Sequence, residues 1–579
     1  MPAAAGQGLI DALRKDPEVE VLRLIRDAGY ESQAAAQPAT SNGRYPLVAV
    51  VEMAPDRAMA LAARPDVYID ADHLLRQGEP VPPPSFVDAG TGTLGEATPL
   101  TFQVNDDHGT ALPDAVVHVV GGLYPVAGTT DADGKVELAV PVDTPDAIRG
   151  VYVRPRPGCW SAWLGSPRLS DTEPNLVTCR RLAATAKGRP IENWANHAMG
   201  FDRLPPTYRG HGVKIAVVGS GIDASHSDLA ERITSGIDIV GHDEKLWGED
   251  LVGRGTHQVA VIAGHDTDAG VTGIAPDAEI HVCRVLPGGR FGDLIEALDY
   301  CIAQEVDVID LGVGSEQIAG LVGQKIEEAR QAGILCVAAA GDLSGPVLFP
   351  GVLPAVLTVG AIGKLGTFPP DSYHATEVYG LPTPEGYFAA RFSCAGPEVD
   401  VCAPGVAVVS AAPGGYAALD SSAVASAYVT ALAALVLAHH PDFRYDFPVR
   451  GPARVDRLMA LIKGSCRRLV PADPNRCGAG LPDAMVAVGL APQLPYPGYP
   501  EQAGFEPAMH PAGAWPAFPP PAGLTPQAGG PPPREGDWSG QERPAGAPGE
   551  APAEAEAALS TLAAAMYAAG LLTTPAPED

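Results

Sequence analysis

Short apolar segments alternate with helical segments over residues 190–490, and this alternation constrains the fold more than any other feature of the sequence. Strand-like stretches such as KIAVVGS, EIHVCRVL and ILCVAAAG are separated by stretches with helical periodicity, such as LIEALDYCIAQ. This alternation predicts an α/β fold with a doubly wound parallel sheet. Because ligands of such sheets bind outside the carboxyl ends of the strands, we expect the functional site at that edge.

The overall composition is that of a chain with several globular parts. Of 579 residues, 46% are hydrophobic and 19% are charged, which is enough apolar material for a sizeable core. Asp and Glu outnumber Lys and Arg by 69 to 39, which gives a net charge of −30. Because such a chain repels phosphate groups and anionic lipids, we expect it to bind neither nucleic acid nor a membrane surface.

Targeting signals and disulfide patterns are not evident in the sequence. The N-terminus lacks a basic region followed by an apolar one, and we expect no membrane span, which would need about 18 uncharged apolar residues. The nine cysteines have neither zinc-ligand nor CxxC spacing. We therefore expect reduced thiols in a cytoplasmic protein, with a Cys466–Cys477 pair as the alternative in an oxidising compartment.

The regions that precede the alternating part differ from it in pattern. Residues 1–44 are interpreted as a helical lead-in and linker, and residues 45–76 as a strand, a helix and a strand. Residues 77–94 are rich in Pro, Gly and Ser, which is typical of a linker. Alternating segments over residues 95–160, separated by turn clusters such as TDADG, predict a small β-sandwich.

The C-terminal region is expected to lack a packed core. Residues 491–552 are rich in proline and glycine, which predicts a disordered linker. Residues 553–572 are rich in alanine, with apolar residues near helical spacing, which predicts a C-terminal helix. Two interpretations of this tail stay open, a peptide that docks on a partner and a weakly structured end.

Six ordered blocks of sequence point to a specific chemistry. They are HGVKIAVVGSGIDASHSDL at 211–229, GRGTHQVAVIAG at 253–264, GVTGIAPDAEIHVCRVL at 270–286, ILCVAAAGD at 334–342, FSCAGPEVDVCAPGVAVVSAAPGGYAALDSSAVASAYVT at 392–430 and GAGLPDAMVA at 478–487. In this order and spacing the blocks resemble the subtilisin-like serine proteases (subtilases). The resemblance covers residues 190–490, about half of the chain, and implies a subtilisin-like version of the predicted parallel sheet.

The positions that match the catalytic triad of this family hold other residues. The resemblance implies an Asp after the first strand, a His at the start of the next helix and a nucleophilic Ser at the start of a later helix. This sequence has Gly219, Arg254 and Ala423 there. Glycine and alanine carry no reacting group, and a guanidinium stays protonated at neutral pH. Because a Ser–His–Asp mechanism uses all three groups, we expect a pseudoprotease.

A fourth altered position matches the oxyanion-hole Asn of the family and holds Asp342. An ionised carboxylate at this position would repel the oxyanion. Two interpretations of Arg254 stay open. In one, Arg254 forms a direct or water-bridged ion pair with Asp342, because the helix dipole disfavours an unpaired cation at a helix N-terminus. In the alternative, Arg254 points to solvent and interacts with Glu249 or Asp250.

Two serines precede the altered nucleophile position and allow two interpretations. In the first, Ser421 or Ser422 is a displaced nucleophile. In the second, which the residue types favour, these serines cap the N-terminus of the helix that begins there.

The peptide-binding surface that the resemblance implies needs no triad. Subtilases bind substrate as an added strand between two cleft segments, which match about 288–293 and 311–315 here. Such pairing depends on main-chain groups. Gly312 stands where the family usually has Ser. The predicted cleft residues are Gly288, Gly289, Leu311, Gly312, Val313 and Gly314.

The resemblance has two further implications. Residues 45–76 resemble the second half of a subtilase propeptide, which would stay attached in a chain that cannot cleave itself. Asp228, Asp266 and Asp268 match one calcium site of the family in the character of their side chains. We nevertheless expect no metal and no other cofactor, with calcium as the alternative.

Three functional hypotheses follow from these residues. The first is a non-catalytic protein with a binding, scaffold or regulatory role, which holds a protein or peptide partner through its cleft, sandwich or tail. The second is a different activity in the altered cleft. The third is a subtilisin-like serine endopeptidase that is weak or uses a displaced nucleophile. The replaced triad favours the first hypothesis.

Overall fold

The computed structural model describes most of the chain up to residue 492. The described residues are 3–26, 47–64, 67–76, 97–121, 125–182, 191, 193–230, 232–233, 235–265 and 270–492. The predicted linker 77–94, the calcium candidates Asp266 and Asp268, the C-terminal helix 553–572 and, apart from its first two residues, the segment 491–552 lie outside them.

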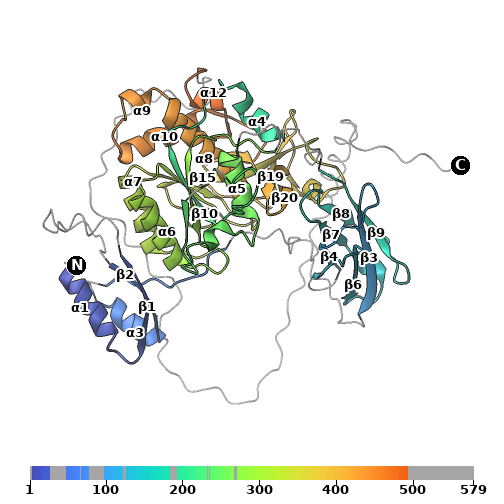
Figure 1. Ribbon diagram of the computed structural model, residues 1–579, viewed down its shortest axis with the longest axis horizontal. Coiled ribbons are helices and arrows are strands. Elements are labelled where there is room, and N and C mark those ends of the chain that lie inside the picture. The colour runs from blue at the N-terminus through green and yellow to red at the C-terminus, as the bar shows by residue number, and fades with distance from the viewer. Residues whose placement is uncertain are drawn as a thin grey trace, which may run out of the picture. The chain divides into compact units, whose positions relative to one another are not determined.

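A nine-stranded sheet forms the centre of residues 193–492 (Figure 1). Its parallel strands are, in spatial order, β11 (Ser235–Asp238), β12 (Glu279–Arg284), β10 (Lys214–Gly219), β13 (Val308–Leu311), β14 (Leu335–Ala339) and β15 (Val356–Lys364), with β18 (Val401–Pro404) also parallel to β15. The strands β17 (Tyr387–Ala390) and β16 (Val378–Tyr379) add an antiparallel edge. The predicted parallel α/β sheet is thereby confirmed.

Helices cover both faces of this sheet. The helices α5 (Arg254–Ala263) and α8 (Ser422–His439) belong to the core cluster on one face, and α6 (Phe291–Ala303) and α7 (Gly320–Gln331) belong to the cluster on the other. Strand β10 contributes side chains to both clusters. Ile215 and Val217 join the first cluster, whereas Ala216 and Val218 join the second. Successive side chains of a strand point to opposite faces, so a strand buried on both sides is apolar throughout.

Helix α8 bears on the expectation that the chain has no membrane span. Its 18 residues contain no charged side chain, and its mean hydropathy of 1.7 makes it long and apolar enough to cross a membrane by length and composition alone. In the fold, 89% of this stretch is buried. Leu432, Leu435 and Val436 are completely buried in the core, so the apolar composition is explained by burial within the protein.

The N-terminal residues form a small antiparallel unit, which differs from the prediction in two places. Its elements are α1 (Ala3–Leu13), β1 (Val19–Arg26), β2 (Leu47–Met53) and α3 (Pro55–Ala62), with β1 antiparallel to β2. The predicted helical lead-in was wrong over β1, because the apolar residues of VEVLRLIR fit both helical and strand spacing. The second strand of the predicted strand–helix–strand run is reduced to isolated β-bridges at Leu74 and Arg76, and the rest of 67–76 forms no regular strand.

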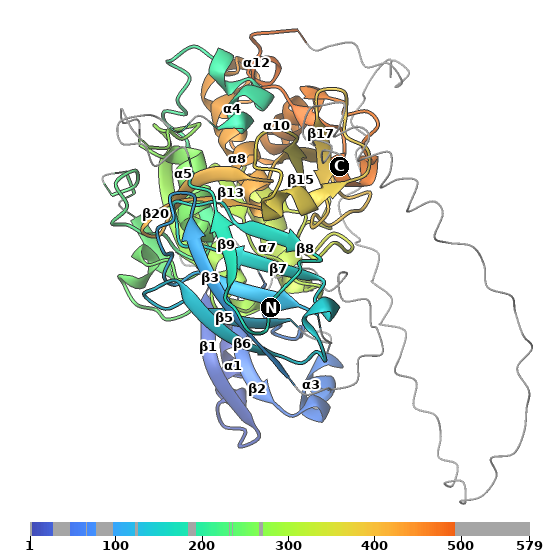
Figure 2. The same cartoon turned by 90° about the vertical axis from the view of Figure 1, so that its right-hand side faces the viewer.

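The predicted sandwich is present and extends past its expected end at residue 160. One sheet holds β6 (Lys135–Val140), β3 (Thr98–Asp106) and β9 (Asn175–Cys179), and the other holds β5 (Val126–Thr129), β4 (Val116–Val120), β7 (Gly150–Arg154) and β8 (Ala162–Gly165). The two sheets share one hydrophobic cluster that includes Phe102, Val117 and Val153. Figure 2 shows the strands of this sandwich from the side.

Short elements complete the part of the chain that surrounds the central sheet. They are the hairpins β19 (Val408–Ala412)–β20 (Gly415–Leu419) and β21 (Cys466–Arg467)–β22 (Leu481–Pro482), the helices α4 (Trp194–Met199), α9 (Asp442–Tyr445), α10 (Pro452–Gly464), α11 (Pro474–Cys477) and α12 (Ala484–Ala487), and the 3₁₀ turns η2 (Pro145–Ala147), η4 (Phe201–Arg203), η5 (Leu246–Gly248) and η6 (Tyr373–Glu377). All nine cysteines are free thiols, so Cys466 and Cys477 are not paired.

Candidate functional site

The three altered triad positions lie on elements that meet at the carboxyl edge of the sheet. Gly219 ends β10, Arg254 begins α5 and Ala423 lies in the first turn of α8. Gln258 connects them: its Nε2 donates to the carbonyl oxygen of Ala423 at 3.2 Å, and its Oε1 is 3.7 Å from where a Cβ on Gly219 would lie. The sequence blocks therefore converge on one site, as expected.

Arg254 forms a direct ion pair with Asp342, the first of the two interpretations that the sequence left open. Its Nη1 is 3.1 Å from Asp342 Oδ2, and the exposed fractions of the two side chains are 9% and 8%. The alternative pairing with Glu249 or Asp250 is wrong, because the Asp250 carboxylate accepts the amide of Thr256 at 2.8 Å and caps α5. The Arg254 cation is thus neutralised at a helix N-terminus that would otherwise disfavour it.

Asp342 is held by four donors, which leaves it no role as an oxyanion donor. Besides Arg254, its carboxylate accepts the Oγ–H of Ser421 at 2.7 Å, the backbone amide of Ser422 at 2.7 Å and the Oγ–H of Ser422 at 2.6 Å. An ionised carboxylate at the start of an 18-residue helix is favoured by the helix dipole. Asp342 therefore acts as an anchor for α8.

The two serines before Ala423 are engaged in the same network. Ser421 is the N-cap of α8, and its Oγ accepts the amide of Ala423 at 3.1 Å, as the capping interpretation predicted. Ser422 Oγ accepts the amide of Gly341 at 3.0 Å. Both hydroxyl protons go to Asp342, and the adjacent Arg254 has no lone pair to accept a proton. Both serines therefore share one acceptor, the Asp342 carboxylate, which is also paired with Arg254.

A second polar layer lies beneath these positions and was missed by the sequence analysis. Asp310 is fully buried and accepts hydrogen bonds from Ser426 Oγ at 2.6 Å and Gln258 Nε2 at 3.2 Å. Burial raises the pKa of Asp310 to about 7, an effect that these hydrogen bonds offset only in part. A carboxylic residue within the apolar strand DVIDLGV was the signal that could have revealed this layer.

His257, the remaining histidine of the matched motif, is structural. It is completely buried, and its Nε2 lies 2.9 Å from the carbonyl oxygen of Val408. Burial lowers the pKa of His257 to about 4, which keeps the ring neutral at pH 7 so that Nε2–H donates to that carbonyl. His257 therefore cannot take over the role of the missing base.

The predicted peptide cleft contains a strand from the chain itself. Leu75 N donates to the carbonyl oxygen of Gly289 at 2.8 Å, while Arg76 and Gly314 exchange two main-chain hydrogen bonds of 2.8 Å each. Leu74 forms an antiparallel bridge with Arg290. Residues 74–76 thus lie between the two predicted cleft segments and pair with both of them.

Acidic side chains fix this strand to the helices beside the cleft. Asp72 Oδ1 accepts the amide of Gly292 in the first turn of α6, and Asp70 Oδ2 accepts the amide of Leu321 in the first turn of α7, both at 2.8 Å. Each carboxylate satisfies an amide that has no partner within its own helix. The propeptide-like segment therefore supplies main-chain pairing and helix caps together.

The other predicted cleft residues play different parts. Leu311 and Val313 are 0% and 3% exposed, and their side chains pack in the core below the cleft, so only main-chain groups of these residues are available to a bound peptide. Gly288 has a positive φ of 90°, which favours glycine. A Cβ on Gly312 would lie 2.6 Å from Gln258 Nε2, so the Ser usual at this position would displace Gln258.

The calcium expectation concerns one described residue, Asp228. This carboxylate is 1% exposed, and it accepts the Tyr416 hydroxyl at 3.1 Å and the amide of Val271 at 2.8 Å. In both contacts an N–H or O–H donor points at a carboxylate oxygen of Asp228 that would have to coordinate a calcium ion. Within the described ranges, no group of three or more His, Cys, Asp or Glu residues is arranged to hold a metal.

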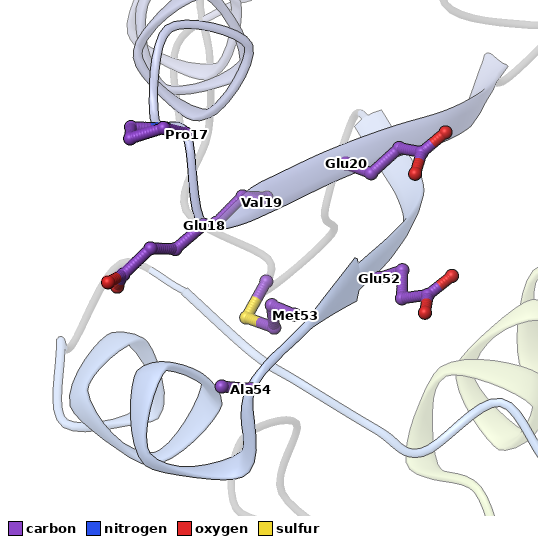
Figure 3. A pocket seen from close by; sticks show the side chains of 7 residues that line it. All are labelled: Pro17, Glu18, Val19, Glu20, Glu52, Met53 and Ala54. Atoms are coloured by element: carbon purple, nitrogen blue, oxygen red, sulfur yellow. The ribbon is translucent and has the colours of Figure 1, made fainter.

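An open pocket lies on the N-terminal unit, on elements other than those of the cleft (Figure 3). It is lined by Pro17, Glu18, Val19, Glu20, Glu52, Met53 and Ala54. Its polar side chains are three glutamates at the paired ends of β1 and β2, without a nucleophile or a base of another kind beside them. The pocket therefore contributes nothing to the chemistry of the cleft.

A parallel α/β sheet that binds an extended strand at its carboxyl edge is the architecture of the subtilisin-like class. Residues 210–480 match the subtilase family. The subtilisin of Bacillus pumilus is 31% identical over 245 residues, which cover 41% of this chain and 80% of that protein. The intracellular serine protease of Paenibacillus polymyxa is 32% identical over 241 residues, which cover 39% of this chain and 67% of that protein.

A longer relative shows the same level of similarity. Subtilisin amylosacchariticus of Bacillus subtilis subsp. amylosacchariticus is 31% identical over 245 residues, and this chain spans 58% of its length. On these similarities, the chain belongs to the subtilase family.

Proposed function

We propose that this chain is a non-catalytic subtilase, a pseudoprotease with a binding, scaffold or regulatory role. The observation that carries the proposal is the Arg254–Asp342 ion pair of 3.1 Å, which occupies the positions of the family's base and oxyanion-hole residue. Ala423 stands at the nucleophile position. A guanidinium accepts no proton and an ionised carboxylate repels an oxyanion, so acyl transfer at these positions lacks its usual base, nucleophile and oxyanion donor.

The arrangement of Ser421 and Ser422 supports this proposal over a displaced nucleophile. A serine attacks a carbonyl when a base removes its proton. Here the hydroxyl groups of both serines donate to Asp342, at 2.7 Å and 2.6 Å. This carboxylate is already held by Arg254, which disfavours its acting as a base.

The retained cleft supports a binding role for a protein or peptide partner. Main-chain groups of Gly289 and Gly314 bind an extended strand with hydrogen bonds of 2.8 Å, a mode of recognition that needs no catalytic residue. In this chain the strand is residues 74–76. A partner that uses the cleft therefore has to displace them, and a partner that uses another surface leaves them in place.

Restoring the triad tests the proposal. The triple variant Gly219→Asp, Arg254→His and Ala423→Ser introduces the three family residues, and there is room for the first, because the nearest atom to a Cβ on Gly219 is 3.7 Å away. We expect the native chain to stay full length and to leave casein intact. The variant should cleave casein and should cut itself within residues 77–96, which follow the cleft strand.

The matched control carries Gly219→Asp and Arg254→His but keeps Ala423. It repeats the two changes that alter charge and lacks the nucleophile, so it should behave like the native chain in both assays. Cleavage of casein by repurified native protein, or a native chain that shortens itself as measured by intact-protein mass spectrometry, would contradict the proposal.

A further inference from the structure

A serine, a histidine and an aspartate lie in hydrogen-bonding order outside the altered cleft positions. Ser161 Oγ is 3.4 Å from His374 Nε2, and His374 Nδ1 is 2.7 Å from Asp420 Oδ1. The three residues come from different parts of the fold: Ser161 directly precedes β8 of the sandwich, His374 lies in the turn η6, and Asp420 precedes the N-cap of α8. Neither the family positions nor any motif in the sequence identifies this set.

Asp420 fixes the orientation of the imidazole. The carboxylate lies 2.7 and 2.8 Å from Nδ1 with its two oxygens, and it also accepts the amide of Ala407 at 2.7 Å. The exposed fractions of the His374 and Asp420 side chains are 3% and 6%. Because the carboxylate accepts the proton of Nδ1, the lone pair of a neutral ring lies on Nε2, the atom that faces Ser161.

The position of Ser161 is set by main-chain pairing between the sandwich and the segment before η6. Tyr373 N donates to Ser161 O, and Trp163 N donates to Asp371 O, each at 3.2 Å. Ser161 is half-buried. Among the described residues, His374 Nε2 is the hydrogen-bond partner of its hydroxyl. A separation of 3.4 Å lies within the range of nucleophile–base pairs in proteins without bound substrate.

Aromatic rings line the histidine on two sides. The Trp160 ring packs edge-on against His374 with centroids 5.4 Å apart, and the Phe368 ring lies at 6.2 Å. These rings pack against the imidazole and give the surroundings of His374 an apolar character. A small apolar acyl or phosphonyl group fits such surroundings better than a charged one.

A second serine–histidine contact in the same protein shows what is special about the first. Ser235 Oγ lies 3.5 Å from His281 Nδ1, and Glu279 lies 2.9 Å from the other ring nitrogen. However, the Ser235 hydroxyl donates to the carbonyl oxygen of Ile280 at 3.1 Å, and the Glu279 side chain is 58% exposed. The Ser235 proton is therefore directed at a backbone carbonyl and not at His281, and the carboxylate beside His281 is exposed to solvent.

We infer that Ser161 is an activated nucleophile, with His374 as its base and Asp420 as the carboxylate that orients the base, and that it reacts with activated esters and phosphonyl fluorides. With an ester, Ser161 Oγ forms a bond to the carbonyl carbon while Nε2 takes the hydroxyl proton. The ester C–O bond then breaks, and the departing oxygen takes that proton. Water hydrolyses the acyl-serine by the same route, which restores the hydroxyl and releases the acid.

The reaction is limited to activated electrophiles because the base supplies most of the activation. General-base assistance contributes about 10²–10⁴-fold, which is too little for amide hydrolysis. This inference does not depend on the proposed function. Proteolysis at the altered cleft would be seen with casein, whereas the reaction of Ser161 is read from the site that becomes labelled.

The test is labelling of the full chain with a fluorophosphonate probe, followed by peptide mapping by mass spectrometry. With the probe, the Oγ–P bond forms, the P–F bond breaks and fluoride leaves, while the proton passes to Nε2. We expect the label on Ser161 in the native protein and none at this position in Ser161→Ala. His374→Gln should slow labelling about 100-fold or more, and p-nitrophenyl acetate hydrolysis should fall in parallel.

The matched control is Ser235→Ala, which removes the hydroxyl from the other serine–histidine contact and should leave labelling of Ser161 unchanged. An unlabelled native protein would overturn the inference, as would a label on Ser235, Ser421 or Ser422 in place of Ser161. Equal labelling rates in the native protein and a folded His374→Gln variant would also overturn it. Ser161→Ala removes a single oxygen, so it decides the assignment even where His374→Gln does not fold.

Discussion

The altered triad positions and the peptide cleft lie at the same edge of the sheet but are held by different groups. At the triad positions, side chains form the network, in which Asp342 accepts four hydrogen bonds from Arg254, Ser421 and Ser422. In the cleft, main-chain groups form the contacts, and Gly289 and Gly314 pair with residues 74–76. Replacing side chains can remove the chemistry of the first region without touching the second.

This difference explains how a chain can depart from its family in one region and keep the other. Main-chain pairing tolerates most substitutions, provided that glycines remain where a side chain has no space. A Cβ on Gly289, for example, would lie 1.9 Å from the carbonyl oxygen of Val285. The side-chain network tolerates few single substitutions, since each member satisfies the charge or hydrogen-bonding needs of another.

The largest effect is expected from Asp342→Ala. This change leaves the buried Arg254 guanidinium unpaired and should lower the free energy of unfolding by about 3–5 kcal/mol, as measured by urea denaturation. Glu316→Ala is the matched control, because its ion pair with Arg76 spans 3.7 Å with side chains 60% and 64% exposed. The control substitution should lower the free energy of unfolding by less than about 1 kcal/mol.

A double variant sharpens this result. Arg254→Met with Asp342→Leu removes both charges and keeps apolar volume, so it should recover much of the loss. A double variant as unstable as Asp342→Ala would show that the serine contacts of Asp342, rather than the ion pair, hold this region together.

Asp310→Asn is expected to change the pH dependence of stability. Burial raises the pKa of Asp310 from 3.8 to about 7, so the native state holds a proton that the unfolded state has lost. Stability therefore falls as the pH rises from about 4 to about 7, by at most about 1.4 kcal/mol per pH unit. The Asn variant lacks this contribution, and its stability relative to the native protein should increase over that range. Parallel curves from urea denaturation at each pH would contradict the prediction.

In the cleft, Leu75→Ala should lower the free energy needed to detach the strand by about 2 kcal/mol. The reason is that this side chain is 5% exposed and belongs to the core on the α6–α7 face. The neighbouring Leu74 is 50% exposed, and Leu74→Ala should have little effect. The measurement is hydrogen exchange at the amides of Arg76 and Gly314. Equal exchange in both variants would mean that main-chain pairing alone holds the strand.

The smallest effects are expected at the two helix caps. Asp72→Ala should speed hydrogen exchange at the Gly292 amide, and Asp70→Ala should speed exchange at the Leu321 amide. In each case the helix end loses about 1 kcal/mol of capping stabilisation. Each variant is the control for the other, because the carboxylates cap different helices. A variant that affects both amides alike would indicate that the whole segment has detached.

Local rules predicted part of this structure well. The apolar strands of the central sheet stood out because burial on both faces makes them continuous runs. The helix dipole made the pairing of Arg254 with Asp342 one of two open interpretations, and the cap at Ser421 followed from its place before an apolar helix. In each case the deciding interaction lies within one element or between residues whose positions the family motifs already placed.

The parts that could not be predicted depend on contacts between distant segments. The sequence predicted a strand at the end of 45–76 but not its partners: residues 74–76 pair with Gly289, Arg290 and Gly314, more than 200 residues away in the sequence. Likewise, Ser161, His374 and Asp420 meet only because the sandwich pairs with the segment before η6. Neither composition nor periodicity contains this information.

The tethering of the cleft strand has a consequence for any peptide added from outside. A segment that belongs to the same chain as its site binds intramolecularly, at an effective concentration set by the length and stiffness of the connecting chain. A free peptide of equal intrinsic affinity has to reach a similar concentration before it occupies half of the clefts. A single backbone cut after Arg76 would leave the strand in the cleft but would end its covalent connection to the cleft residues. In the intact chain this contact does not depend on protein concentration. After the cut, dilution would weaken it.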